Sequence, residues 1–201
     1  MILYCGWLFE KRTNWQEHMP EPERDNRYGD EKWHGEELPR RWKKLEADAS
    51  MHLTAGRVAE VVAYSSGDEP YYAGDAVGFV DLLIKLAKPE ERLIVAGVGV
   101  SKSIRHTLYT YRMETGRPAP LWLWAMTTEG IPRYYALRSP DFHAIDISTL
   151  GGTREAKIPI NRLSSSWGLP PPADERGWTH VAVAAAVKHI AMGMGIDERM
   201  L

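Results

Sequence analysis

The chain has 201 residues, 44% of them hydrophobic and 26% charged, which is the composition of one globular domain with a core of its own. Its formal net charge of −2 excludes a globally basic surface, so nucleic-acid binding would need a local patch. The lone Cys5 excludes an internal disulfide and is typical of a reducing compartment, and no apolar run approaches the roughly 20 residues of a membrane span. We therefore expect a cytoplasmic protein without a membrane contact.

The first half of the chain predicts three strands and a helix. An apolar run at residues 2–9 predicts a buried strand, residues 57–64 a second strand, and residues 70–74 a short third strand after a turn. At residues 76–88 the apolar side chains of Phe79, Leu83 and Leu86 recur at helical spacing, and Pro89 follows them. This pattern predicts a helix that ends before the proline.

Residues 10–50 interrupt these elements with a charged segment that contains Trp15, Trp33 and Trp42. Disordered segments rarely keep several tryptophans. We therefore expect an ordered insertion into a single domain of residues 1–201, with a short helix near residues 39–49. Because its tryptophans stand among charges, the insertion is expected to contact a protein partner.

The second half of the chain predicts alternating strands and helices. Residues 93–97 and 142–147 are expected to be strands. Helices are expected at residues 101–115, with Ser101 as the cap and Gly116 past the end, and at residues 159–167 and 180–194. This order predicts an α/β fold with a mixed central sheet and flanking helices.

Four segments, in order, resemble the predicted 3′–5′ exonucleases related to the proofreading domain of family B DNA polymerases. Residues 158–170 read Ile-Pro-Ile-Asn-Arg-Leu-Ser-Ser-Ser-Trp-Gly-Leu-Pro and are similar to a short helix of that family. Residues 53–58, 93–120 and 143–147 are similar to the entry of its second strand, to its second catalytic region and to a strand that carries an aspartate. The resemblance implies a ribonuclease H-like exonuclease fold.

The same resemblance implies a reaction that needs four carboxylates. Two lie on the first strand, one at the start of a helix, and one on the last helix. Together they would hold two divalent cations, Mg²⁺ or Mn²⁺, about 3.5–4 Å apart, which activate a water and stabilise the leaving oxygen. Such hard cations require oxygen ligands.

None of these carboxylates is present at the matching positions of this chain. Gly6 and Leu8 stand where the first-strand acids are expected, Ile104 stands at the helix position, and Lys188 stands at the position on the last helix. Ala184 occupies the place of the general base. The alignment therefore predicts no catalytic residue, no metal site and no cofactor.

Basic side chains are the alternative candidates for a nucleic-acid contact. Lys102, Arg105, His106 and Arg112 share the helix at residues 101–115 and are expected either to grip DNA or RNA phosphates or to form an ordinary solvated face. Lys188 is expected either to replace the lost cation near Gly6 to Leu8 or to reach water from a helix surface.

Three functions follow from these observations. The leading one is a catalytically degenerate exonuclease-like domain that serves as a binding or assembly module in a nucleic-acid-processing complex. The second is an active exonuclease whose acids have moved, with Glu10, Asp146 and either Asp81 or Asp75 binding Mg²⁺ or Mn²⁺. The third is a purely structural subunit that binds protein and no nucleic acid.

Overall fold

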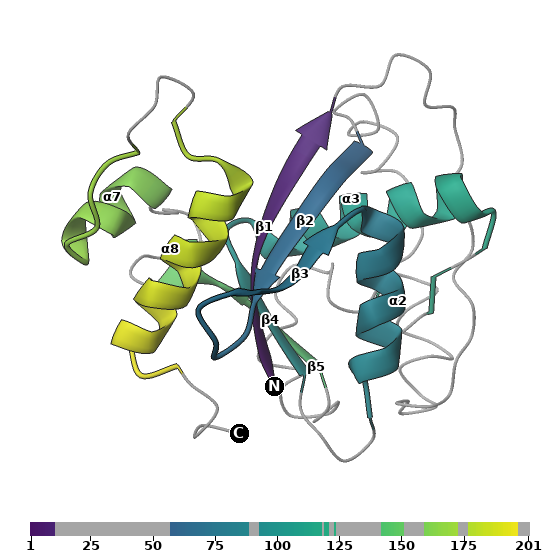
Figure 1. Cartoon of the computed structure of the whole chain (residues 1–201), viewed down its shortest axis with the longest axis horizontal. Coiled ribbons are helices and arrows are strands. Elements are labelled where there is room, and N and C mark those ends of the chain that lie inside the picture. Colours follow the sequence, from purple (N-terminus) through teal and green to yellow (C-terminus); the bar gives the residue numbers. More distant parts are fainter. Residues whose placement is uncertain are drawn as a thin grey trace.

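Five strands form one mixed sheet at the centre of the domain (Figure 1). The computed structural model describes residues 1–10, 57–88, 93–117, 119–120, 123, 142–150, 159–172 and 177–196. The strands are β1 (Ile2–Glu10), β2 (Arg57–Tyr64), β3 (Pro70–Gly74), β4 (Leu93–Gly97) and β5 (Phe142–Asp146). Their order across the sheet is β3-β2-β1-β4-β5.

Only β2 runs opposite to the other four strands. It pairs antiparallel with β1 on one side and with β3 on the other, whereas β4 lies parallel to β1 and β5 parallel to β4. The β1–β2 register places Tyr4 opposite Tyr64 and Glu10 opposite Arg57, with a shift between Leu8 and Phe9. The turn between β2 and β3 therefore lies beyond the amino end of β1.

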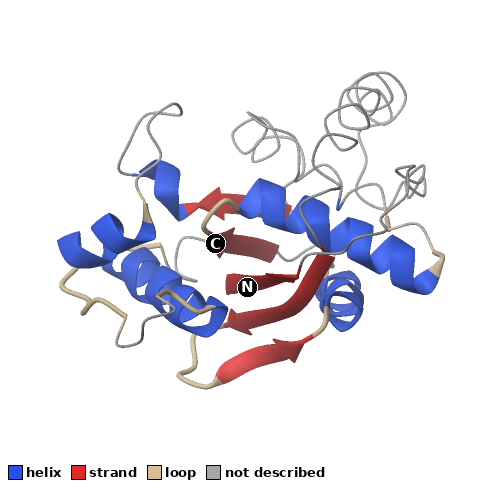
Figure 2. Cartoon of the chain, turned by 90° about the horizontal axis from the view of Figure 1, so that it is seen from above, coloured by secondary structure: helices blue, strands red, loops and turns tan. Residues whose placement is uncertain are grey.

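Helices cover both faces of the sheet, as the view from above shows (Figure 2). Helices α2 (Ala76–Leu86) and α3 (Val100–Thr115) pack on one face. Helices α6 (Ile147–Leu150), α7 (Ile160–Ser166) and α8 (His180–Gly193) pack on the other. The resulting three layers enclose two hydrophobic cores.

The alternation of side chains along β1 divides these cores. Leu3, Cys5 and Trp7 belong to the core beneath α2 and α3, and Ile2 and Tyr4 belong to the core beneath α8. Successive side chains of a strand point to opposite faces, so a strand covered on both sides reads as a continuous apolar run. The buried strand that this run predicted is confirmed.

Helix ends follow partly from local signals. Gly116 adopts a left-handed conformation with φ of 69° at the end of α3, as its position past the helix predicted. The prediction that Ser101 caps α3 is wrong, because the helix begins at Val100 and Gly99 occupies the cap. The short helix α6 was not predicted, since four residues directly after a strand are too few to show a helical period.

The predicted α/β class with a mixed sheet and flanking helices is confirmed. The expected insertion at residues 10–50, with its tryptophans and its short helix, lies outside the described residues apart from Glu10. Among the described helices, none has both the length and the apolar character needed to span a bilayer.

The thiol of Cys5 is expected to be chemically inert in the native protein. Cys5 has no exposed surface, and its burial raises the pKa of the thiol above its ordinary value, so almost no thiolate forms near neutral pH. A colorimetric disulfide reagent should therefore detect no thiol until denaturant is added, and then detect one per chain. Rapid reaction without denaturant would contradict the tight packing of β1.

Candidate functional site

The face of β1 that should carry the catalytic acids is closed by the first turn of α8. A Cβ atom added at Gly6 would overlap the carbonyl oxygen of His180 and lie 2.8 Å from its carbonyl carbon and 3.1 Å from the Ala184 nitrogen. Real Cβ atoms do not approach backbone atoms so closely. Glycine at this position therefore allows the close approach of strand and helix, and any larger side chain is excluded.

The second first-strand position, Leu8, does not supply a ligand either. Its side chain is 41% exposed, and Val181 in the first turn of α8 is equally exposed. Both side chains are hydrocarbon and cannot bind a hard cation. Leu8 and Val181 are thus apolar where the resemblance implies metal ligands, and the carboxylate of Glu60, opposite Leu8 on β2, lies 3.1 Å from Nε2 of His180.

The position implied for the third acid lies on the wrong side of the sheet. Ile104 is 1% exposed and packs with Leu3 and Cys5 in the core beneath α2 and α3. Gly6 contacts α8 on the opposite face. Two ligands separated by the sheet cannot share a metal pair, so the structure does not bring these two aligned positions together.

Lys188 points away from the place where we expected it. Its Nζ donates to the carbonyl oxygen of Gly67 and lies 3.2 Å from Oδ1 of Asp68, both in the turn between β2 and β3. That turn lies beyond the amino end of β1, whereas Gly6 to Leu8 lie toward its carboxyl end. The expected placement of Lys188 near Gly6 to Leu8 is therefore wrong: its side chain, 12% exposed, connects α8 to the exposed turn after β2.

The three acids of the alternative nuclease each have a structural role. Glu10 accepts from Arg57 at 3.2 Å, and Arg57 also donates to Glu114 at 2.7 Å. These hydrogen bonds, that to Glu114 first, raise the pKa of the Arg57 guanidinium. Asp81 lies on α2, and its Oδ1 is 3.5 Å from the hydroxyl of Tyr111 on α3.

Asp146 is the last residue of β5, and its carboxylate binds the backbone at the start of α3. Its Oδ1 accepts from the Gly99 amide at 3.1 Å, from the Ser148 amide at 3.1 Å and from the Ser148 hydroxyl at 2.6 Å. The amide at the cap of α3 is therefore already bonded to a carboxylate. Within the described segments, no three His, Cys, Asp or Glu side chains gather as metal ligands, so Glu10, Asp81 and Asp146 do not form one site.

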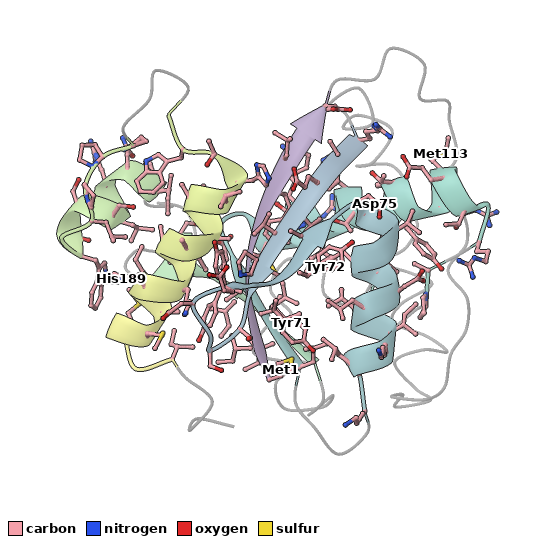
Figure 3. All side chains as sticks on the ribbon, in the orientation of Figure 1. Met1, Tyr71, Tyr72, Asp75, Met113 and His189 are labelled. Carbon is pink, nitrogen blue, oxygen red and sulfur yellow. The ribbon has the colours of Figure 1, made fainter. Side chains whose placement is uncertain are left out.

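Asp75 also has a local role, at the junction of β3 and α2 (Figure 3). Its side chain accepts from the Gly78 amide at 2.8 Å and so caps α2. The Tyr72 hydroxyl donates to the Asp75 carbonyl oxygen at 2.7 Å. Burial, with the charges of Asp75 and Asp81 adding to it, raises the pKa of Tyr72 to about 12.

The basic residues of α3 do not form one exposed face. Lys102 is exposed and Arg105 is half-buried, but His106 is only 3% exposed, and its ring meets Phe9 edge-on with centroids 5.5 Å apart. Arg112 donates to the carbonyl oxygen of Gly116 at the end of the same helix. His106 therefore cannot grip a phosphate from solution, and Lys102 and Arg105 remain the candidates.

A pocket of about 380 Å³ lies beside α7, and its lining residues were not predicted as a site from the sequence. Helix α7 contributes Asn161, Arg162 and Ser165, and the chain beyond it contributes Pro171 and Trp178. Polar residues at helical spacing mark the outer face of α7 in the sequence. The sequence does not indicate that Trp178 lines the same pocket.

No family model matches this chain, and neither a curated protein nor a solved structure matches it.

Proposed function

We propose that this chain is a ribonuclease H-like exonuclease domain that has lost its metal site and serves as a binding or assembly module in a nucleic-acid-processing complex. The mixed sheet, with strand order β3-β2-β1-β4-β5, and the helices on both of its faces agree with the α/β class that the resemblance implies. Fold does not fix function, so the functional part of the proposal depends on the site.

The contact of Gly6 with α8 is the observation that carries the loss of catalysis. The backbone of His180 occupies the space that a carboxylate side chain would need at this position. Glu10, the nearest acid along β1, is already paired with Arg57. A two-metal mechanism needs several oxygen ligands around one space, and among the described residues no three His, Cys, Asp or Glu side chains gather in one place.

A nuclease assay tests the catalytic part of the proposal. We expect single- and double-stranded DNA and RNA to stay intact with the protein in Mg²⁺ or Mn²⁺, because no described carboxylate cluster is available to bind a metal pair. Metal-dependent shortening that Glu10→Gln abolishes would instead establish the active nuclease with relocated acids. A Glu114→Gln variant is the matched control, since Glu114 pairs with the same arginine.

A binding assay tests the nucleic-acid part. Phosphate contacts predict weak, salt-sensitive binding of a labelled oligonucleotide that Lys102→Ala and Arg105→Ala each reduce. Lys188→Ala should leave this binding unchanged, because its amine is held by the turn after β2. Absence of binding at low salt would favour the purely structural subunit, for which the exposed Leu8 and Val181 offer an apolar contact surface.

A further inference from the structure

The pocket beside α7 is lined by polar residues of that helix and by apolar residues of the chain beyond it. Asn161, Arg162 and Ser165 are its polar wall. Leu169, Pro171 and Trp178 are its apolar wall. No carboxylate is among the described residues that line it, and the guanidinium of Arg162 is the one formal charge among them.

The hydrogen-bonding groups still available on the polar wall are mainly donors. Oδ1 of Asn161 already accepts from the Arg162 amide at 2.9 Å, and the Ser165 hydroxyl donates to the Asn161 carbonyl oxygen at 2.9 Å. The Asn161 amide NH₂ and the Arg162 guanidinium remain to donate. A ligand of this wall must therefore be rich in acceptors, and a negative charge on it would strengthen the contact with Arg162.

The apolar wall fits a flat ring. Trp178 and Pro171 both carry rings and both line the pocket. The Trp178 indole nitrogen is buried and has no hydrogen-bond partner among the described residues. An unsatisfied buried donor lowers stability, so an acceptor brought within its reach would be favoured.

We propose that this pocket binds a nucleotide, with the phosphate at Arg162 and the base against Trp178. A nucleotide combines an anion, a planar ring and a polar ring edge in one molecule, and aromatic side chains stack bases of any sequence. The volume of about 380 Å³ lies within the range of small-ligand pockets. The source of the nucleotide is either a free nucleoside monophosphate or the end of a single strand.

Binding of a strand end rests on the proposed function, whereas binding of a free nucleoside monophosphate does not. Helix α7 packs on the face of the sheet opposite to α3 (Figure 2). The pocket is therefore separate from Lys102, which lies on α3. Variants of one are therefore not expected to change the other. This separation lets the two proposals fail independently.

Indole N–H resonances give a direct measurement of pocket binding. The protein is labelled with ¹⁵N and titrated in separate arms with adenosine monophosphate, inorganic phosphate and a single-stranded DNA oligonucleotide. We expect one indole resonance to shift saturably with the nucleotide and with the oligonucleotide. Trp178→Phe, which keeps an aromatic ring, should remove that same resonance. Tighter binding of the oligonucleotide identifies a strand end as the ligand, and equal or weaker binding identifies the free nucleotide.

Two variants test the role of the charge. Arg162→Gln should weaken nucleotide binding about tenfold, because a charge-assisted hydrogen bond is lost. Lys85→Gln, which removes an exposed positive charge from α2, is the matched control and should leave the Trp178 shift unchanged. Folding of each variant is checked by the dispersion of its remaining resonances.

Three outcomes would overturn the inference. The first is the absence of an indole shift with nucleotide or oligonucleotide up to about millimolar concentration. The second is a shift that is assigned to another tryptophan. The third is inorganic phosphate that binds as tightly as the nucleotide. Oligonucleotide binding that Lys102→Ala reduces while the Trp178 resonance stays still would overturn the pocket and keep the proposed function. Oligonucleotide binding that shifts the Trp178 resonance and is unchanged by Lys102→Ala would support the pocket. It would contradict the proposed contact of Lys102 with nucleic acid.

Discussion

Replacing Gly6 by alanine is expected to lower the free energy of unfolding by about 3 kcal/mol, although only one methyl group is added. The new Cβ would meet the backbone of His180 and the Ala184 nitrogen rather than a flexible side chain. Relief requires α8 to move away from β1, which loosens the core that Val187 and Ile190 build with Ile2. Urea or guanidinium unfolding of both proteins measures the difference.

Gly67→Ala is the matched control for this substitution. No atom lies within 4 Å of a Cβ added at Gly67, and its backbone is not in the left-handed region. Its stability should stay within about 0.5 kcal/mol of the parent or rise slightly, because alanine restricts the unfolded chain. If Gly6→Ala were as stable as Gly67→Ala, α8 would not be packed against β1 as described.

The same contact determines what placing an acid at Gly6 can achieve. Gly6→Asp adds a longer side chain at the position where alanine already overlaps backbone. We therefore expect it to destabilise the domain at least as much as Gly6→Ala and to create no metal site. The absence of an acid at this position is coupled to the packing of α8, so a single substitution cannot create a metal ligand there.

The sequence predicts those parts of this fold that depend on local patterns. The apolar run of β1 and the helical spacing of Phe79 and Leu83 predicted buried elements, because burial on one or both faces constrains which residue types are tolerated. Gly116 marked the end of α3, since a left-handed residue after a helix is most often glycine. These signals need no knowledge of distant residues.

The site could not be predicted in the same way, because its contacts join residues far apart in the chain. Lys188 bonds to a turn 120 residues earlier, and Gly6 meets a helix that begins at His180. His106 belongs to a basic stretch in the sequence, yet the fold buries it against Phe9. Charge and spacing indicate which side chains are polar, whereas only the packing of α3 and α8 decides which of them reach solvent.

Placing an acid at Ile104, where the resemblance implies a metal ligand, is expected to cost about 4 kcal/mol of stability and to yield no metal site. Ile104 lies on α3 and packs in the core between α2, α3 and the sheet. Gly6 contacts α8 on the opposite face of the sheet. The carboxyl group of Ile104→Asp would therefore lie among hydrocarbon side chains such as Leu108 and Val95. Chemical denaturation with and without Mg²⁺ measures both effects, and metal should not restore stability.

The loss of stability in Ile104→Asp should depend on pH, and this dependence identifies burial as its cause. Burial raises the pKa of a carboxyl group in the folded state above the value of about 3.9 that it has in the unfolded chain. Above about pH 4 the folded state then binds more protons than the unfolded state, so stability falls as the pH rises until the folded-state pKa is passed. The matched variant Ile104→Asn has similar size and no titrating group, so its cost relative to the parent protein should not change with pH. Equal pH profiles for the two variants, or a gain in stability of Ile104→Asp on adding Mg²⁺, would mean that this position is open to solvent and to metal after all.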